Sequence, residues 1–149
     1  MTRQLEDGVR ALMLDAWYVG ADVLLCHTLP FCGNPRRSLA DGLGEVRDFL
    51  ASHRSEVVTL LFESYAAAAD VAAAFAEAGL LDDVYVHAGG EWPTLGEMIG
   101  RGERLVVLTD DRLSDADRAR ECGAFHGRIP NFVTVDYYEI GDVFDVVGR

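Results

Sequence analysis

The sequence predicts an α/β protein built on a parallel sheet, and three observations support this. Short runs of apolar, β-branched residues alternate with stretches of helical periodicity along the 149 residues. The runs are almost continuously apolar, which is typical of strands buried on both faces of a parallel sheet. A complete eight-stranded α/β barrel takes ~250 residues, or about 31 per unit, so this chain has room for about five units. We therefore expect one domain over residues 1–149 with about five parallel βα units.

Five apolar runs are the predicted strands, and each reads as a strand because it is short, rich in β-branched residues and separated from the next by a helical pattern. A weaker run over residues 84–87 predicts a short extra strand or an extended loop. The five predicted strands cover residues 9–15, 23–27, 57–63, 104–110 and 131–136.

Helical periodicity fills the segments between these strands. Ser38 is a predicted N-cap, and apolar residues recur at helical spacing from there to Leu50. The alanine-rich segment 70–78 ends at Gly79, a natural C-terminal residue for a helix. Three further helices are predicted over residues 94–99, between Pro93 and Gly100, and over 114–124 and 139–147.

The charge and hydropathy of the chain narrow the range of functions. The formal net charge is −12, with 25 acidic and 13 basic residues, and all the basic ones are arginine. This balance argues against binding to a nucleic-acid backbone or to an anionic membrane, and it is compatible with a cation such as Ca²⁺. No apolar run of ~18 residues is present, so no transmembrane segment is expected. No secretory signal is recognised in this chain, because no basic segment precedes an apolar stretch at Met1.

The sequence does not decide whether any of the three cysteines form a disulfide. Cys26 and Cys32 flank a segment rich in proline and glycine, and their spacing fits either a small disulfide or two reduced thiols. Cys122 stands alone in a predicted helix and is expected to serve in packing. The absence of a CxxC pair argues against a zinc site built on thiolates.

An ionisable residue ends each of the five predicted strands. The carboxyl ends of parallel strands form one rim, where α/β proteins build their sites, so we expect these side chains to converge. Carboxylates are the ligands that Ca²⁺ prefers, and an imidazole transfers protons. We predict that His27 and Asp136 are catalytic and that Asp15 and Glu63 bind the metal. The five rim residues are Asp15, His27, Glu63, Asp110 and Asp136.

Each rim residue also has a purely structural interpretation. Asp15 can cap a turn, His27 can sit at the edge of the core beside a cysteine, and Asp136 can be solvated. Asp110 and Asp111 can cap the following helix. Three other histidines, His53, His87 and His126, fall at a helix end, in a loop and before a turn glycine, and no functional role is expected for them.

Several of these segments resemble a known family. Residues 4–17, 23–28 and 57–64 are similar to strands of the catalytic X domain of phosphatidylinositol-specific phospholipase C, and residues 91–96, 104–110 and 130–141 resemble its bacterial branch. The family has a distorted TIM barrel and cleaves phosphodiesters through attack by a neighbouring hydroxyl group. The resemblance implies a partial or shortened TIM-barrel-like fold, an inositol phospholipid or related head group as substrate, and a secreted protein.

The resemblance also implies residue roles. Asp15 and Glu63 match positions that bind Ca²⁺ in metal-dependent members, and His27 matches the general acid toward the leaving group. Two positions depart from the pattern. Met13 stands where metal-dependent members carry a glutamate ligand, and Trp17 lies near the arginine that replaces the cation in metal-free members.

Family members also have an upstream strand that carries the first catalytic histidine, and we expect this chain to begin after that strand. A further stretch between Asp110 and Pro130 is expected to be shortened. Three functions follow: a phospholipase C-like phosphodiesterase, an inactive relative with a binding or structural role, and a fragment that acts within a longer protein.

Overall fold

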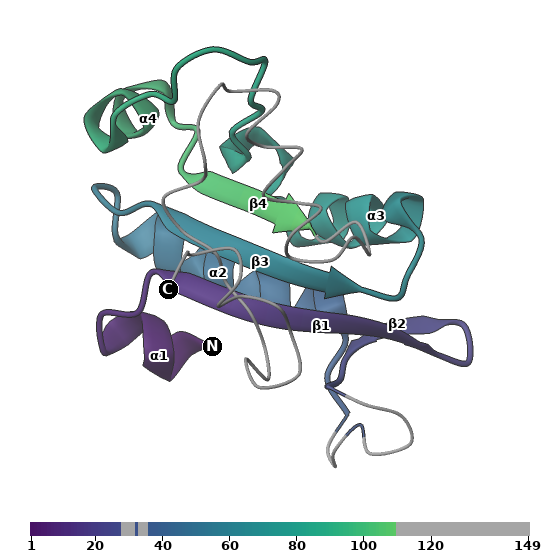
Figure 1. Ribbon diagram of the computed structural model, residues 1–149. Helices are drawn as coiled ribbons and strands as arrows, with labels where there is room; N and C mark the ends of the chain where they lie inside the picture. The colour runs from purple at the N-terminus through teal and green to yellow at the C-terminus, as the bar shows by residue number, and fades with distance from the viewer. Residues whose placement is uncertain (28–31, 33–35, 110–149) are drawn as a thin grey trace, which may run out of the picture. The chain divides into compact units, whose positions relative to one another are not determined.

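The computed structural model describes residues 1–27, 32 and 36–109 (Figure 1). The chain divides into two compact units, residues 1–110 and 111–149, and the described residues lie in the first. The predicted strand over 131–136 and the helices over 114–124 and 139–147 therefore fall outside the described residues. The same holds for Asp110, Asp111, Cys122, His126 and Asp136.

Four described strands form a mixed sheet in the order β2-β1-β3-β4. β1 (Ala11–Val19), β3 (Val58–Ser64) and β4 (Leu105–Thr109) run parallel to one another. β2 (Asp22–Leu25) pairs with β1 in the antiparallel sense. The predicted α/β class is thus confirmed, and four of the five predicted strands are strands in the structure, three of them in the predicted parallel sense. The weaker run contributes one bridge, from Val84 to Leu105.

The antiparallel β2 corrects the prediction of an all-parallel arrangement. Only Gly20 and Ala21 separate β1 from β2, and Gly20 has a φ of 70°. A connection of two residues can only make a hairpin, because a parallel crossover needs a dozen residues or more. The sequence prediction ended the first strand at Asp15, whereas β1 continues to Val19. Among the described residues the sheet stays open, so a barrel is not confirmed.

The helices largely follow the predicted signals. The Ser38 hydroxyl accepts a hydrogen bond from the backbone N–H of Asp41 at 2.9 Å, which confirms Ser38 as an N-cap. Gly79 ends a helix in the left-handed conformation, as expected. The described helices are α1 (Thr2–Glu6), α2 (Leu39–Ser52), α3 (Ala68–Ala78), the short 3₁₀ helix η1 (Leu81–Asp83) and α4 (Leu95–Arg101).

One face of the sheet packs against α2 and α3, which lie on the same side of the strands (Figure 1). Alternate residues of the strands point into this core, because successive side chains in a strand face opposite sides. The core residues are apolar and almost fully buried. They include Leu12, Leu14 and Ala16 of β1, Leu60 and Phe62 of β3, Leu43, Val46 and Phe49 of α2, and Phe75 of α3.

No helix in the described part of the chain has the length and apolar character needed to cross a membrane.

An ion pair between Arg10 and Glu56 makes the free energy of unfolding depend on pH. The Arg10 Nε lies 2.7 Å from a Glu56 carboxylate oxygen, and this hydrogen bond lowers the pKa of Glu56 below its ordinary value of 4.5. A carboxyl group with a lowered pKa in the folded state stabilises the fold above its unfolded pKa. That stabilisation is lost as the pH falls through the folded-state pKa.

We therefore expect Glu56→Gln to remove part of the acid sensitivity of this protein. Between pH 7 and pH 3, the free energy of unfolding of the wild type should fall more than that of the variant. Urea titrations at both pH values measure this difference. Glu77→Gln, which removes a different exposed carboxylate, is the control. Equal pH dependence in the wild type and Glu56→Gln would show that the ion pair contributes nothing.

Candidate functional site

Two neighbouring parallel strands place Asp15 beside Glu63. These residues are direct partners in the register of β1 and β3. Both lie on the face opposite α2 and α3, since the adjacent Leu14 and Phe62 point into the core. The structure thus brings the two predicted metal ligands to one level of the sheet. The sequence predicts Asp15 at the end of its strand, whereas the structure places it within β1.

His27 joins this pair from the end of the hairpin. The backbone N–H of Cys26 donates to the carbonyl oxygen of Asp15 at 2.9 Å, which extends the antiparallel ladder one residue beyond β2. The Nδ1 of His27 then lies 2.6 Å from a carboxylate oxygen of Asp15. The Asp15 side chain is 12% exposed and that of His27 is 55% exposed, so the carboxylate lies beneath an accessible imidazole.

The contact between Asp15 and His27 defines what the imidazole can do. A carboxylate only accepts hydrogen bonds, so Nδ1 carries the hydrogen that it donates to Asp15. The other ring nitrogen, Nε2, is then the one that can take up or release a proton in acid–base chemistry. The negative charge of Asp15 also stabilises a positive charge on the ring. This is the arrangement of an oriented general acid–base catalyst.

A disulfide closes the segment that follows the hairpin. Cys26 and Cys32 are bonded, with their Cα atoms 4.7 Å apart. The sequence had left this pairing open. Because Cys26 directly precedes His27, the cross-link restrains the backbone that carries the imidazole.

Reduction of this disulfide should lower the stability of the fold. Its closed loop is short, with a sequence separation of six, so the loop-closure model gives a loss of about 2 kcal/mol in the free energy of unfolding. Urea unfolding with and without a phosphine reductant measures the effect. Cys32→Ser should show the same loss and no further response to the reductant. An unchanged wild-type transition under full reduction would contradict the prediction.

Two aromatic residues extend the site by one step along the strands. Tyr65 follows β3, and its hydroxyl donates to a carboxylate oxygen of Glu63. Its ring stacks on Trp17, with centroids 3.6 Å apart and an interplanar angle of 18°. Trp17 appears in the sequence-based prediction only as a departure from the family pattern, and Tyr65 is not among the predicted site residues. The sequence contains a signal for both aromatic residues. Trp17 follows Asp15 by two residues and Tyr65 follows Glu63 by two residues, so each shares a face with its acidic neighbour.

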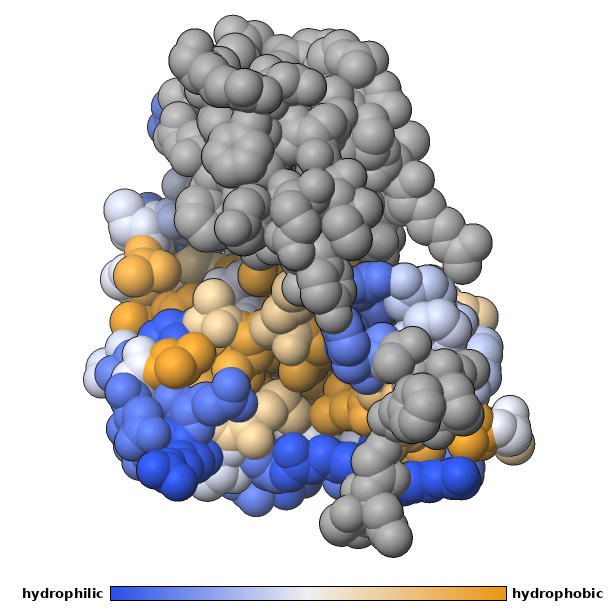
Figure 2. Space-filling model, turned by 60° about the horizontal axis from the view of Figure 1, so that its bottom comes forward, coloured by the Kyte–Doolittle hydropathy of each residue, from blue (hydrophilic) through white to orange (hydrophobic). Residues whose placement is uncertain are grey.

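The surface of this unit carries both apolar and hydrophilic side chains. Met13, two residues before Asp15 on the same face of β1, is 45% exposed, and Val9 is 39% exposed. Figure 2, which brings the α1 and β2 side of Figure 1 forward, shows apolar side chains in the middle of the view and hydrophilic ones along its lower edge. Exposed apolar side chains of β1 and the residues before it therefore lie on the same part of the chain as Asp15.

The described residues alone do not fit a Ca²⁺ site. This ion takes six to eight oxygen ligands, and the site offers two carboxylates. The Glu63 carboxylate already accepts a hydrogen bond from the Tyr65 hydroxyl, and the Asp15 carboxylate already contacts His27. The side chain of Met13 supplies no oxygen. No group of three or more His, Cys, Asp or Glu that could hold a metal occurs in the described part of the chain. A cation at Asp15 and Glu63 would need further oxygen ligands from outside the described residues.

Two histidines lie away from this site, as expected. His53 ends α2, where its ring stacks on Phe49 with centroids 4.2 Å apart. The ring of His87 stacks on Trp92, and its Nδ1 lies 3.0 Å from the Tyr85 hydroxyl oxygen.

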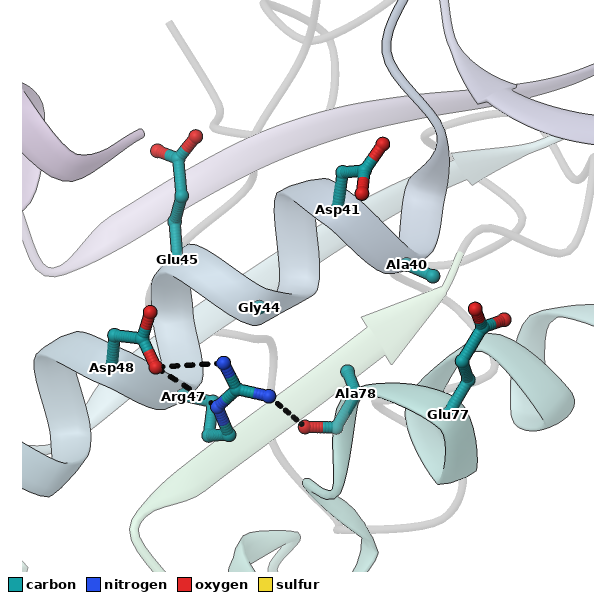
Figure 3. Close-up of a pocket in the computed structure, with 8 residues that line it drawn as sticks. All are labelled: Ala40, Asp41, Gly44, Glu45, Arg47, Asp48, Glu77 and Ala78. Atoms are coloured by element: carbon teal, nitrogen blue, oxygen red, sulfur yellow. Dashed lines mark hydrogen bonds and ion pairs between the residues drawn. The ribbon is translucent and has the colours of Figure 1, made fainter.

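A hollow lies between α2 and α3, on the side of the sheet away from Asp15 (Figure 3). Its single basic side chain, Arg47, donates to the carbonyl oxygen of Ala78 at 3.2 Å and to the Asp48 carboxylate. Through these hydrogen bonds Arg47 links α2 to α3, and its guanidinium is already engaged by protein groups. The other lining residues are small or acidic. The lining comprises Ala40, Asp41, Gly44, Glu45, Arg47, Asp48, Glu77 and Ala78.

Comparison with known proteins places this geometry in context. The family model described as PI-PLC X matches residues 1–120. A PI-PLC X domain-containing protein of Arabidopsis thaliana is 35% identical over 120 residues, which cover 73% of this chain and 28% of the relative. The fungus Arthroderma benhamiae has a PI-PLC X domain-containing protein 1 that is 33% identical over 127 residues, covering 79% of this chain and 41% of the relative.

A second protein of the same fungus, described as an uncharacterized secreted protein, is 32% identical over 114 residues and is covered to 26% of its length. The chain therefore spans between about a quarter and two fifths of these relatives. They are plant and fungal proteins, so the comparisons do not support the bacterial branch. No solved structure gave a significant match.

Proposed function

This chain belongs to the PI-PLC X domain family, and on that premise we propose that it is a phosphoric diester hydrolase of the phospholipase C-like type. The observation that carries the proposal is the contact of 2.6 Å between Asp15 and the Nδ1 of an accessible His27. It supplies an oriented proton donor beside a second carboxylate, Glu63, on one face of the sheet.

The proposed reaction uses His27 as the general acid. A hydroxyl group next to the phosphodiester attacks phosphorus, and its proton passes to a base. The bond between phosphorus and the leaving oxygen breaks with its electron pair on that oxygen. The Nε2 of His27 donates a proton to the leaving oxygen while Asp15 holds the ring through Nδ1. Asp136 stays a sequence-based prediction for a second catalytic group.

We propose an inositol phospholipid, or a related head group, as the substrate and an extracellular location for the protein. Family membership supports the substrate class. The location is supported by the fungal relative described as secreted. It is also supported by the disulfide between Cys26 and Cys32, because disulfides persist in oxidising compartments.

Assistance by Ca²⁺ at Asp15 and Glu63 stays a sequence-based prediction, and thermal unfolding tests it. If the ion binds there, Ca²⁺ at 100 times its dissociation constant should add about 2.7 kcal/mol to the free energy of unfolding. The melting temperature should rise accordingly. Glu63→Ala should abolish that rise. A melting temperature that is indifferent to Ca²⁺ would remove the cation from the proposal and leave the role of His27 intact.

The direct test is an assay of the full 149-residue chain on mixed vesicles of phosphatidylcholine and phosphatidylinositol. We expect release of a water-soluble inositol phosphate and a matching amount of diacylglycerol. Vesicles of phosphatidylcholine alone are the control for the head group. If a folded chain releases neither product from the mixed vesicles, with and without added Ca²⁺, the proposed activity on this substrate is wrong.

A further inference from the structure

We propose that Tyr18 is a positioning residue: it fixes the turn between β3 and α3 and thereby holds the Tyr65 hydroxyl on Glu63. This inference rests on the proposed function for its catalytic consequence. Its structural part, the coupling of Tyr18 to Tyr65, stands on contacts that are independent of any activity.

The Tyr18 hydroxyl makes two hydrogen bonds to the start of α3. It donates to a carboxylate oxygen of Asp70 and accepts from the backbone N–H of Ala67 at 3.0 Å. The hydrogen bond to Asp70 raises the pKa of Tyr18 above its ordinary value of 10.0. The phenol therefore stays protonated and able to donate throughout the neutral pH range.

The start of α3 depends on this hydroxyl because its own N-cap is weak. Ala67 is the N-cap residue, and it has no side chain that can accept a hydrogen bond from the first turn. Asp70 lies in that first turn, where a negative charge suits the helix dipole. Tyr18 links both residues to β1, and its hydroxyl satisfies the backbone N–H of the N-cap residue, one of the groups that a helix leaves without an intrahelical partner.

The turn that Tyr18 holds carries Tyr65 at its other end. The backbone N–H of Tyr65 donates to the carbonyl oxygen of Ala16 at 2.9 Å. Within the turn, the Ser64 hydroxyl donates to the carbonyl oxygen of Ala66 at 3.1 Å. Residues 65 to 67 are thus attached to β1 at both ends, through Ala16 and through Tyr18.

Successive residues of β1 contact the turn from the two faces of the sheet. Trp17 stacks on the Tyr65 ring on the face of Asp15, whereas Tyr18 reaches Ala67 on the face of the helices. With the turn fixed, the stacked ring directs its hydroxyl at Glu63. Loss of the Tyr18 hydroxyl releases the attachment at Ala67 and lets the Tyr65 ring change its position over Trp17.

The experiment uses the full chain in a Trp92→Phe background, so that Trp17 is the only tryptophan. Near-ultraviolet circular dichroism and emission then report on the stacking of Trp17 with Tyr65. Tyr18→Phe removes the hydroxyl alone. Tyr85→Phe is the matched control, because it also removes a tyrosine hydroxyl that makes a hydrogen bond, but to His87 and far along the chain from the turn.

We expect Tyr18→Phe to change the circular dichroism and emission of Trp17, and Tyr85→Phe to leave both unchanged. Turnover of phosphatidylinositol should fall about tenfold in kcat with little change in KM, the size expected for the loss of one hydrogen bond to a charged group. In a double-mutant cycle, Tyr18→Phe should have no further effect on kcat when Tyr65→Phe is already present, because the two act through one contact.

Two results would overturn the inference. One is an unchanged Trp17 signal in Tyr18→Phe, and the other is additive effects of Tyr18→Phe and Tyr65→Phe on kcat. A loss of melting temperature alone, without these signatures, would also show that Tyr18 is only structural. If the wild type has no phosphodiesterase activity, the proposed function fails, and the Trp17 signals still decide whether Tyr18 positions Tyr65.

Discussion

Replacement of His27 by alanine should lower phosphodiester turnover by about 10²–10⁴-fold, the range for the loss of a general acid–base catalyst. The loss should appear in kcat, because the imidazole acts on the leaving oxygen as the bond to phosphorus breaks. The fold should persist, since the His27 side chain is 55% exposed and makes no part of the core. Initial rates on mixed vesicles and a thermal melt of each variant measure both quantities.

The leaving group sharpens this test. In a p-nitrophenyl ester of inositol phosphate the leaving group is p-nitrophenolate, which departs without protonation. His27→Ala should therefore be much less impaired on this ester than on phosphatidylinositol. His53→Ala is the matched control, because His53 ends α2 and lies outside the site. Equal impairment on both substrates would contradict the role as general acid. Undiminished turnover of phosphatidylinositol would contradict any catalytic role for His27.

Replacement of Leu60 by alanine should lower the free energy of unfolding by about 2–5 kcal/mol. Leu60 lies in the middle of β3, is fully buried and packs in the core between the sheet and the helices. Truncation removes apolar contacts and leaves a cavity that the neighbouring strands cannot close. Because a whole domain is stable by only about 5–15 kcal/mol, the variant should unfold at a much lower urea concentration.

Leu81→Ala provides the comparison for this effect. It makes the same chemical change in η1, where the leucine is 54% exposed. Its cost should stay within about 0.5 kcal/mol, as for most surface substitutions. Similar losses in the two variants would show that the face of β3 toward α2 and α3 is not the core of this unit.

The parts of the fold that were predicted correctly depend on local patterns. The apolar runs of β3 and β4 are short and β-branched, and they are strands in the structure close to the predicted bounds. Ser38 caps α2 and Gly79 ends α3, because each residue type satisfies backbone groups within its own segment. Such signals act over a few residues and can be read in order along the chain.

The errors have a common physical origin. A charge after an apolar run predicts that the strand ends at Asp15, whereas β1 continues to Val19 and the chain returns at once as β2. The polar side chain is tolerated there because it faces away from the core and meets His27. Whether a charge ends a strand or lies within it depends on what packs against that face, and the local sequence does not contain this information.

Local patterns in the sequence are enough to predict the α/β class, the position of most helices and strands, and the presence of Asp15, His27 and Glu63 on or beside strands. Which of these side chains meet depends on the tertiary structure. The contact of His27 with Asp15 required the antiparallel hairpin, and the level of Glu63 required the register of β3 against β1. The link from Tyr18 to Ala67 joins residues 49 positions apart. These contacts depend on how the chain reverses and pairs, because the energy that selects them comes from burial and hydrogen bonding between distant segments.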